Sequence, residues 1–154
     1  MKKRDSFFFE LLKQLVIFLF GGFLYGAVEI LYRAHTHPSM FITGGLCLVW
    51  VGGLNSFFGR VLPLPAQMAV GSAIITTAEL ICGLIVNVGF GMDVWDYSDL
   101  PFNFMGQICL RFVVIWFFFS FVAIAAEDLI RARVFGEEKK RLFKRDFREI
   151  FKRD

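Results

Sequence analysis

The stretch WDYSDLPFNFMGQIC, residues 95–109, separates two long apolar runs and decides how this chain folds. Acidic, aromatic and turn-forming side chains gather in it. Pro101 and Gly106 interrupt any continuous helix, because proline lacks an amide donor and glycine is conformationally free. Trp95 and Tyr97 combine an apolar ring with a polar tip, which is typical of the membrane–water interface. The stretch therefore predicts a boundary loop that dips toward a bilayer between two membrane-spanning helices.

The composition on either side of this loop is that of an integral membrane protein. Hydrophobic residues make up 56% of the 154 residues, against roughly 45–50% in soluble domains. The mean hydropathy is +0.60. A helix needs about 20 apolar residues to cross a bilayer, and four runs approach this length: residues 14–32, 40–58, 66–90 and 106–126. We expect an all-α polytopic protein with four transmembrane helices.

The two ends of the chain are charged. Residues 1–13 form a basic lead, and residues 14–133 form the predicted transmembrane domain. Residues 134–154 predict a charged amphipathic helix that contacts membrane lipid or a partner protein rather than nucleic acid. Its apolar stripe consists of Phe143, Phe147, Ile150 and Phe151. Because the ends are basic and the 95–109 loop carries acids without Lys or Arg, we expect cytoplasmic N- and C-termini.

Polar side chains inside the apolar runs are the first candidate site. Ionised groups within a membrane are costly, so such residues face protein or water and mark functional sites by default. A structural ion pair, for instance with Arg33, or a neutral carboxyl is the alternative reading of Glu29. Arg111 is either a partner of these acids or an interfacial side chain reaching for water. The predicted intramembrane polar site consists of Glu29, Glu79, Asn87 and Arg111.

Two further groups of side chains have weaker signals. His35 and His37 lie two residues apart and, with Glu29, are weak candidates for a metal site. Zinc needs three or four ligands, so a hydrogen-bonded loop is the alternative and we expect no metal or other cofactor. The aromatic positions of the fourth run predict a lipid-facing side: Trp116, Phe117, Phe118, Phe119 and Phe121.

Three segments carry a resemblance to a known family. They are RAHTHPSMFITGG at 33–45, ITTAELICGLIVN at 75–87 and the 95–109 stretch. In these segments the chain resembles the putative ABC-transporter type IV family of small bacterial membrane proteins, and the resemblance covers most of residues 22–131. The resemblance implies a multi-spanning inner-membrane protein linked to transport, and it assigns no substrate or catalytic residue. The matched positions are Glu29, Glu79, Asn87, Trp95, Asp96, Tyr97, Pro101, Asn103 and Gly106.

Missing motifs narrow the functional classes. The sequence has no G-x-x-x-x-G-K-[ST], G-x-S-x-G, H-E-x-x-H or C-x-x-C, so we expect no enzyme and no ATPase in this chain. The first hypothesis is a permease-like component that works as a homo-oligomer or with a partner membrane or ATPase subunit. The alternative is a membrane scaffold or sensor that recruits a partner through residues 134–154. A third is a metal-dependent membrane enzyme using His35, His37 and Glu29.

Overall fold

The computed structural model describes residues 3–58 and 61–137. Four helical segments are long and apolar enough to cross a membrane: Phe7–Leu31, Pro38–Phe58, Leu64–Gly89 and Leu110–Val134. This confirms the predicted all-α membrane protein with four transmembrane helices. The predicted C-terminal amphipathic helix lies outside the described residues, apart from its first few positions. The elements are α1 (Lys3–Arg33), α2 (Pro38–Gly52), α3 (Leu54–Phe58), α4 (Leu64–Gly83), the π-helical turn η1 (Leu84–Gly89), β1 (Asn103–Phe104), β2 (Ile108–Cys109) and α5 (Leu110–Val134).

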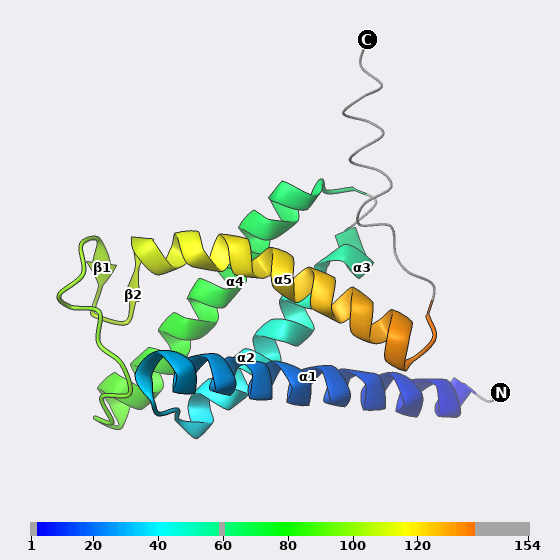
Figure 1. Cartoon of the computed structure of the whole chain (residues 1–154), viewed down its shortest axis with the longest axis horizontal. Helices are drawn as coiled ribbons and strands as arrows, with labels where there is room; N and C mark the ends of the chain where they lie inside the picture. The colour runs from blue at the N-terminus through cyan, green and yellow to red at the C-terminus, as the bar shows by residue number, and fades with distance from the viewer. Residues whose placement is uncertain (1–2, 59–60, 138–154) are drawn as a thin grey trace, which may run out of the picture.

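The four spans run alternately in opposite directions (Figure 1). We call the end that carries residues 34–37 and 90–109 the loop end. The opposite end, with α3 and the first turns of α1, is the terminal end. Helix α2 lies in the middle and contacts α1, α4 and α5. Helices α1 and α5 come together at the terminal end and separate toward the loop end, as Figure 1 shows.

Small residues bring α1 and α2 close together. A Cβ added at Gly45 would lie 2.6 Å from the ring of Phe18, and one at Gly21 would lie 2.5 Å from Cβ of Leu48. Close backbone approach of this kind is how membrane helices gain packing energy without a hydrophobic driving force. The core beside this contact includes Val51 and Ile124, both 0% exposed. Gly21 and Gly45 therefore serve the packing of α1 against α2.

The bounds of the fourth span differ from the prediction. Helix α5 begins at Leu110 rather than at Gly106 and continues to Val134 rather than ending near 126. Gly106 has a φ of +67°, and Cys109 pairs with Asn103 in the two-stranded β1–β2 sheet, so the helix cannot start earlier. At the other end, Glu127 binds Arg131 one turn later, which keeps the charged segment helical.

The ends of α2 and α4 show how local sequence sets the boundaries. Pro38 occupies the first turn of α2, where its missing N–H costs nothing, and His37 caps this helix by accepting the N–H of Ser39. Helix α4 ends in the π-helical turn η1, which contains Asn87. Such π turns are frequent at functional sites. This one turns the buried Asn87 toward the 90–109 segment.

Candidate functional site

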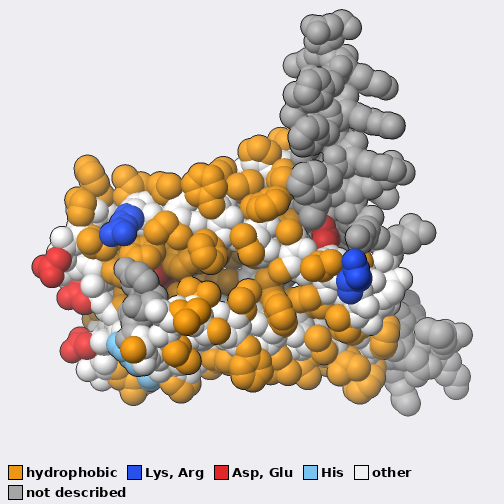
Figure 2. Space-filling model, in the orientation of Figure 1, with side chains coloured by type: hydrophobic (Ala, Val, Ile, Leu, Met, Phe, Trp, Pro, Cys, Tyr) orange, Lys and Arg blue, Asp and Glu red, His pale blue; other side chains and the backbone are white. Residues whose placement is uncertain are grey.

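A cavity of about 400 Å³ lies between α1 and α5. Figure 2 shows the molecule's apolar surface with a hollow between the two rows of side chains that belong to these helices. We call this space the α1–α5 cleft. Side chains from α1, α2, α4, α5 and the 90–109 segment line it: Gly21, Leu24, Tyr25, Val28, Glu29, Gly44, Cys47, Leu48, Ile75, Tyr97, Arg111, Phe112, Ile115, Trp116, Phe119, Val122 and Ala123.

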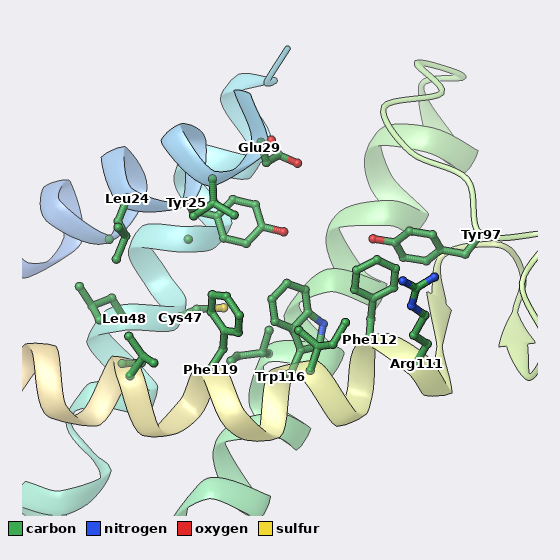
Figure 3. A pocket seen from close by; sticks show the side chains of 17 residues that line it. Leu24, Tyr25, Glu29, Cys47, Leu48, Tyr97, Arg111, Phe112, Trp116 and Phe119 are labelled. Carbon is green, nitrogen blue, oxygen red and sulfur yellow. The ribbon is translucent and has the colours of Figure 1, made fainter. Parts of the chain in front are cut away.

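Aromatic rings form one wall of the cleft. Tyr97 stacks on Phe112 with ring centroids 4.6 Å apart, and Phe112 lies 6.0 Å from Trp116. Trp116 also meets Phe119 edge to face at 5.9 Å and Tyr25 of the opposite wall at 6.3 Å. The rings of Tyr25 and Tyr97 extend into the cavity from opposite sides (Figure 3). The wall is thus a continuous row of rings.

Glu79 lies behind this aromatic wall and holds two of its rings. Its carboxylate accepts hydrogen bonds from the Tyr97 hydroxyl at 3.1 Å and from Trp116 Nε1 at 2.8 Å. The residue is 2% exposed and is not among the cleft-lining side chains. A buried acceptor with two aromatic donors fixes the orientation of both rings. The role of Glu79 in this geometry is therefore to position the cleft wall.

Trp116 was predicted on the lipid-facing side of the fourth span, but it is a buried residue of the cleft lining. It is only 9% exposed, and its indole N–H donates to Glu79. Neighbouring Phe118 and Phe119 are both exposed, and Phe119 also lines the cleft. A run of aromatic residues covers every face of a helix, so composition alone cannot separate the rings that face the cleft from those that face outward. The hydrogen-bond partner of Trp116 is Glu79, which lies 37 residues earlier in the chain, so the local sequence around Trp116 does not reveal it.

Glu29 and Arg111 are the two charged side chains of the cleft lining. Both lie at the loop end (Figure 3). Glu29 is 5% exposed and accepts a hydrogen bond of 2.6 Å from the Thr36 hydroxyl. Arg111 stands exposed on the first turn of α5. No ion pair among residues 3–58 and 61–137 uses Arg111. The cleft therefore has a charged mouth, while the side chain of Arg33, suggested as a partner of Glu29, lies outside the described residues.

Asn87 serves the 90–109 segment and does not line the cleft. Its amide donates to the Trp95 carbonyl at 2.9 Å and to Gln107 Oε1 at 2.8 Å, and its Oδ1 accepts the Val94 N–H at 2.8 Å. The Trp95 indole N–H donates in turn to the Gln107 carbonyl at 3.0 Å. Glu79 and Asn87 thus act on the same segment at two points. We call Asn87, Trp95 and Gln107 the loop lock.

The remaining motif residues shape the tip of the segment. Asp96 accepts from the Ser98 hydroxyl at 2.6 Å and from the Ser98 N–H at 2.8 Å, and these bonds hold the pKa of this carboxyl below its usual range. Asn103 donates to the Leu100 carbonyl at 2.8 Å. Gly106 has a φ of +67°, which L side chains rarely adopt, and a Cβ there would also lie 2.5 Å from Oδ1 of Asp96, so glycine is favoured at this position. Pro101 lies exposed in the turn before β1.

The histidines take part in local hydrogen bonding. Nδ1 of His37 lies 2.8 Å from the Ser39 hydroxyl, and this ring caps α2. His35 is exposed in the 34–37 turn. Within the described residues, no three His, Cys, Asp or Glu side chains are placed to hold a metal ion. The geometry around His37 is that of a helix cap.

A second cluster of charged residues, at the terminal end, was not expected from the sequence. Lys13 of α1 donates to Glu10 at 2.7 Å and to Glu137 at 2.5 Å, although it is only 6% exposed. Arg131 of α5 binds Glu127 and lies 3.6 Å from Glu10. We call these five residues the ion cluster. The i,i+3 and i,i+4 spacings of Glu10–Lys13 and Glu127–Arg131 were the available sequence signal.

Comparison with known proteins identifies the family. No curated protein and no solved structure matches the chain. Residues 14–144 match the family described as Putative ABC-transporter type IV. This region contains most of α1, the whole of the other three spans, the cleft lining and the loop lock. The match covers most of the sequence and agrees with the motif at 95–109. The chain therefore belongs to the Putative ABC-transporter type IV family of membrane proteins.

Proposed function

We propose that this chain is the permease-like membrane component of a transport system and that the α1–α5 cleft receives its solute. The observation that carries the proposal is the shape of the cleft. It reaches from the charged mouth at Glu29 and Arg111 inward to Val122 and Ala123. Beyond that depth the ion cluster joins α1 to α5. A site open at one end and closed at the other is what one state of an alternating-access protein requires.

The family membership supports a transport role, and the sequence supports a division of labour. No phosphate-binding loop of the G-x-x-x-x-G-K-[ST] type is present in these 154 residues, so in this proposal ATP hydrolysis is supplied from outside them. In this proposal the chain itself catalyses no reaction and uses no cofactor. Four helices enclose little space, so a second copy or a partner membrane subunit completes the pathway.

The orientation is part of the same proposal. The basic ends of the chain place the terminal end on the cytoplasmic side of a bacterial inner membrane. The cleft mouth then opens near the external face, and the ion cluster closes the cytoplasmic side. An ATPase partner acts at the terminal end, where breaking the ion cluster would separate α1 from α5.

The test is solute flux in liposomes that contain the purified full chain with any co-purifying subunits. Labelled sugar, amino acid, fatty acid and K⁺ are tested separately. Glu79→Gln keeps one acceptor oxygen for two aromatic donors, so we expect about a tenfold or greater loss of flux from the disordered wall. Thr77→Val on the exposed side of α4 is the control. Flux that is unchanged in Glu79→Gln, or absent for every solute, contradicts the proposal.

One observation favours a second function, a membrane scaffold or sensor. Glu137 is held by Lys13 at 2.5 Å and by Arg131 at 3.3 Å, so the point from which residues 138–154 continue is anchored to the bundle. Recruitment of a partner through these residues would then depend on the state of the ion cluster. Removal of residues 138–154 distinguishes the two functions. If the protein is a scaffold, the truncated chain no longer co-purifies with its partner. A partner that still co-purifies contradicts the scaffold function.

A further inference from the structure

We propose that the α1–α5 cleft binds a single-chain amphiphile with an anionic head group, with the chain among the aromatic rings and the head group at Arg111. This inference rests on the proposed function, since it names the class of compound that the cleft receives. Four features of the cleft support it: length, wall chemistry, position of the charges and access from the bilayer.

The length of the cleft matches one leaflet of a bilayer. Its lining on α5 extends from Arg111 to Ala123. At 1.5 Å per residue, these twelve steps cover roughly 18 Å. Half of a hydrocarbon core is about 15 Å. An acyl chain with its head group at Arg111 therefore extends to the bottom of the cleft and no further.

The wall chemistry fits a chain rather than a polar solute. Below the mouth, the lining consists of apolar and aromatic side chains such as Leu24, Leu48 and Phe119. Apart from the tyrosine hydroxyls of Tyr25 and Tyr97, the lining below the mouth offers a hydroxylated or charged solute few hydrogen bonds in exchange for its lost hydration, which is unfavourable. The volume of about 400 Å³ lies at the low end of the range for small-molecule pockets, roughly 300–1,000 Å³. A slender, mostly apolar compound satisfies both limits.

The charges of the mouth select the head group. Glu29 is buried and already accepts the Thr36 hydroxyl, so it offers little to a ligand. Arg111 is exposed, lines the cleft and takes part in no ion pair within the described residues. A guanidinium binds carboxylate and phosphate through paired N–H donors. The mouth is therefore suited to an anionic head group.

The cleft is also accessible from the hydrocarbon side. Its walls α1 and α5 are both candidate membrane spans, and Figure 2 shows the hollow on an apolar face. Leu24 and Val28, on the rim that α1 provides, are each 42% exposed. An amphiphile can thus enter laterally with its chain in the bilayer, and its head group remains at the depth of the loop end.

Quenching of tryptophan fluorescence by a brominated chain tests the inference directly. The full chain carrying Trp50→Phe, which removes the exposed tryptophan of α2, retains Trp116 of the cleft wall and the buried Trp95 of the loop lock. The same chain with Trp116→Phe added gives the contribution of Trp95, and both proteins are placed in nanodiscs of phosphatidylcholine. The probes are a fatty acid dibrominated at mid-chain and the methyl ester of the same acid, which has no charge. We expect saturable quenching, with the acid binding about tenfold more tightly than the ester, as one charge-assisted pair implies.

Two variants and their controls separate head group from chain. Arg111→Gln should reduce the preference for the acid to within about twofold, whereas Arg133→Gln, an exposed arginine near the other end of α5, should leave it unchanged. Val28→Phe fills the cleft and should weaken both probes, whereas Val114→Phe, exposed on α5 outside the lining, should weaken neither.

Two results would overturn the inference. Quenching that rises linearly and is the same in Val28→Phe shows that no chain binds in the cleft. Saturable quenching with equal affinity for acid and ester, unaffected by Arg111→Gln, shows that the cleft takes a chain without selecting an anionic head group. If either result is found together with flux that Glu79→Gln abolishes, the transport function is still supported. Only the proposed class of ligand is then wrong.

Discussion

The two ends of the α1–α5 pair are held by opposite kinds of chemistry. At the terminal end, α1 and α5 are joined by the ion cluster, in which Lys13 and Glu127 are 6% and 1% exposed. At the loop end the two helices separate, and the 90–109 segment is fixed to α4 instead, through the loop lock and Glu79. One end is thus closed by ion pairs, and the other is kept open by hydrogen bonds that hold the 90–109 segment.

This difference shows how a small bundle can keep a cavity without collapsing. When one partner of a buried ion pair is removed, the other is left as an uncompensated buried charge, which is strongly destabilising. An interface held by such pairs is therefore either fully formed or broken. Hydrogen bonds of Trp95 and Asn87 to neighbouring groups are individually modest but fix geometry. The terminal end is therefore suited to switching, and the loop end is suited to holding the aromatic wall in place.

The largest expected effect comes from breaking the ion cluster. Arg131→Met leaves Glu127 buried without its partner, since the other oxygen, Oε2, already lacks a hydrogen-bond donor within the described residues. We expect the free energy of unfolding to fall by about 3–5 kcal/mol. The measurement is denaturant unfolding of the purified protein in detergent, followed by circular dichroism.

Arg133→Met is the matched control for this variant. Arg133 lies exposed on the same turn of α5, and its loss should change stability by less than about 0.5 kcal/mol. A loss below about 1 kcal/mol for Arg131→Met would mean that the charges do not hold the terminal end closed.

A smaller effect is expected at the loop lock. Asn87→Ala removes three hydrogen bonds and leaves the Trp95 carbonyl and the Val94 N–H without this partner. We expect a loss of about 2–3 kcal/mol, confined to the loop end, because the affected groups lie outside the helix interfaces. Hydrogen exchange should rise at Val94 and stay unchanged in the last turns of α5. Faster exchange in both regions would show that the two ends are not independent.

The smallest effect concerns the acid dependence of the loop tip. The Ser98 hydroxyl and N–H lower the pKa of Asp96, so this carboxyl favours the folded loop above its ordinary pKa, about 3.9, and that contribution is lost as pH falls through the lowered value. Ser98→Ala removes the hydroxyl bond and should raise the pKa of Asp96 toward its usual range. Carbon NMR of the carboxyl measures this, with Ser39→Ala, in the other turn of the loop end, as the control. An unchanged pKa in Ser98→Ala would assign the shift to other groups.

The sequence was sufficient for the architecture, because the length and polarity of a membrane span are local properties. It also identified Glu79 and Asn87, since polar side chains stand out in an apolar run. Their partners were not predictable. Tyr97 and Trp116 meet Glu79 across 18 and 37 residues of sequence. Asn87 was grouped with a membrane-spanning polar site, whereas the π turn directs it to the 90–109 segment.

The sequence allowed two interpretations of Arg111: an ion pair with the intramembrane acids, or a side chain that reaches the interface. Its position at the start of α5 favours the second. Arg111 stands on the first turn of α5, where a long side chain reaches the exterior. The start of that helix was misplaced because Gly106 has a positive φ and β2 precedes Leu110. Backbone conformation of this kind depends on the neighbouring Asp96 and Asn103, which sequence spacing does not show.

Helices α1 and α5 are held together at the terminal end and lie apart at the loop end. Electron–electron distance measurements between spin labels test this arrangement on protein in lipid, with the three cysteines changed to alanine. One spin-label pair joins exposed Ile30 to Leu110 at the loop end, and the other joins exposed Leu12 to Val134 at the terminal end. We predict a longer distance for the first pair, and a broader distance distribution for only the second pair in Arg131→Met. Equal distances, or a shorter one at the loop end, would contradict it.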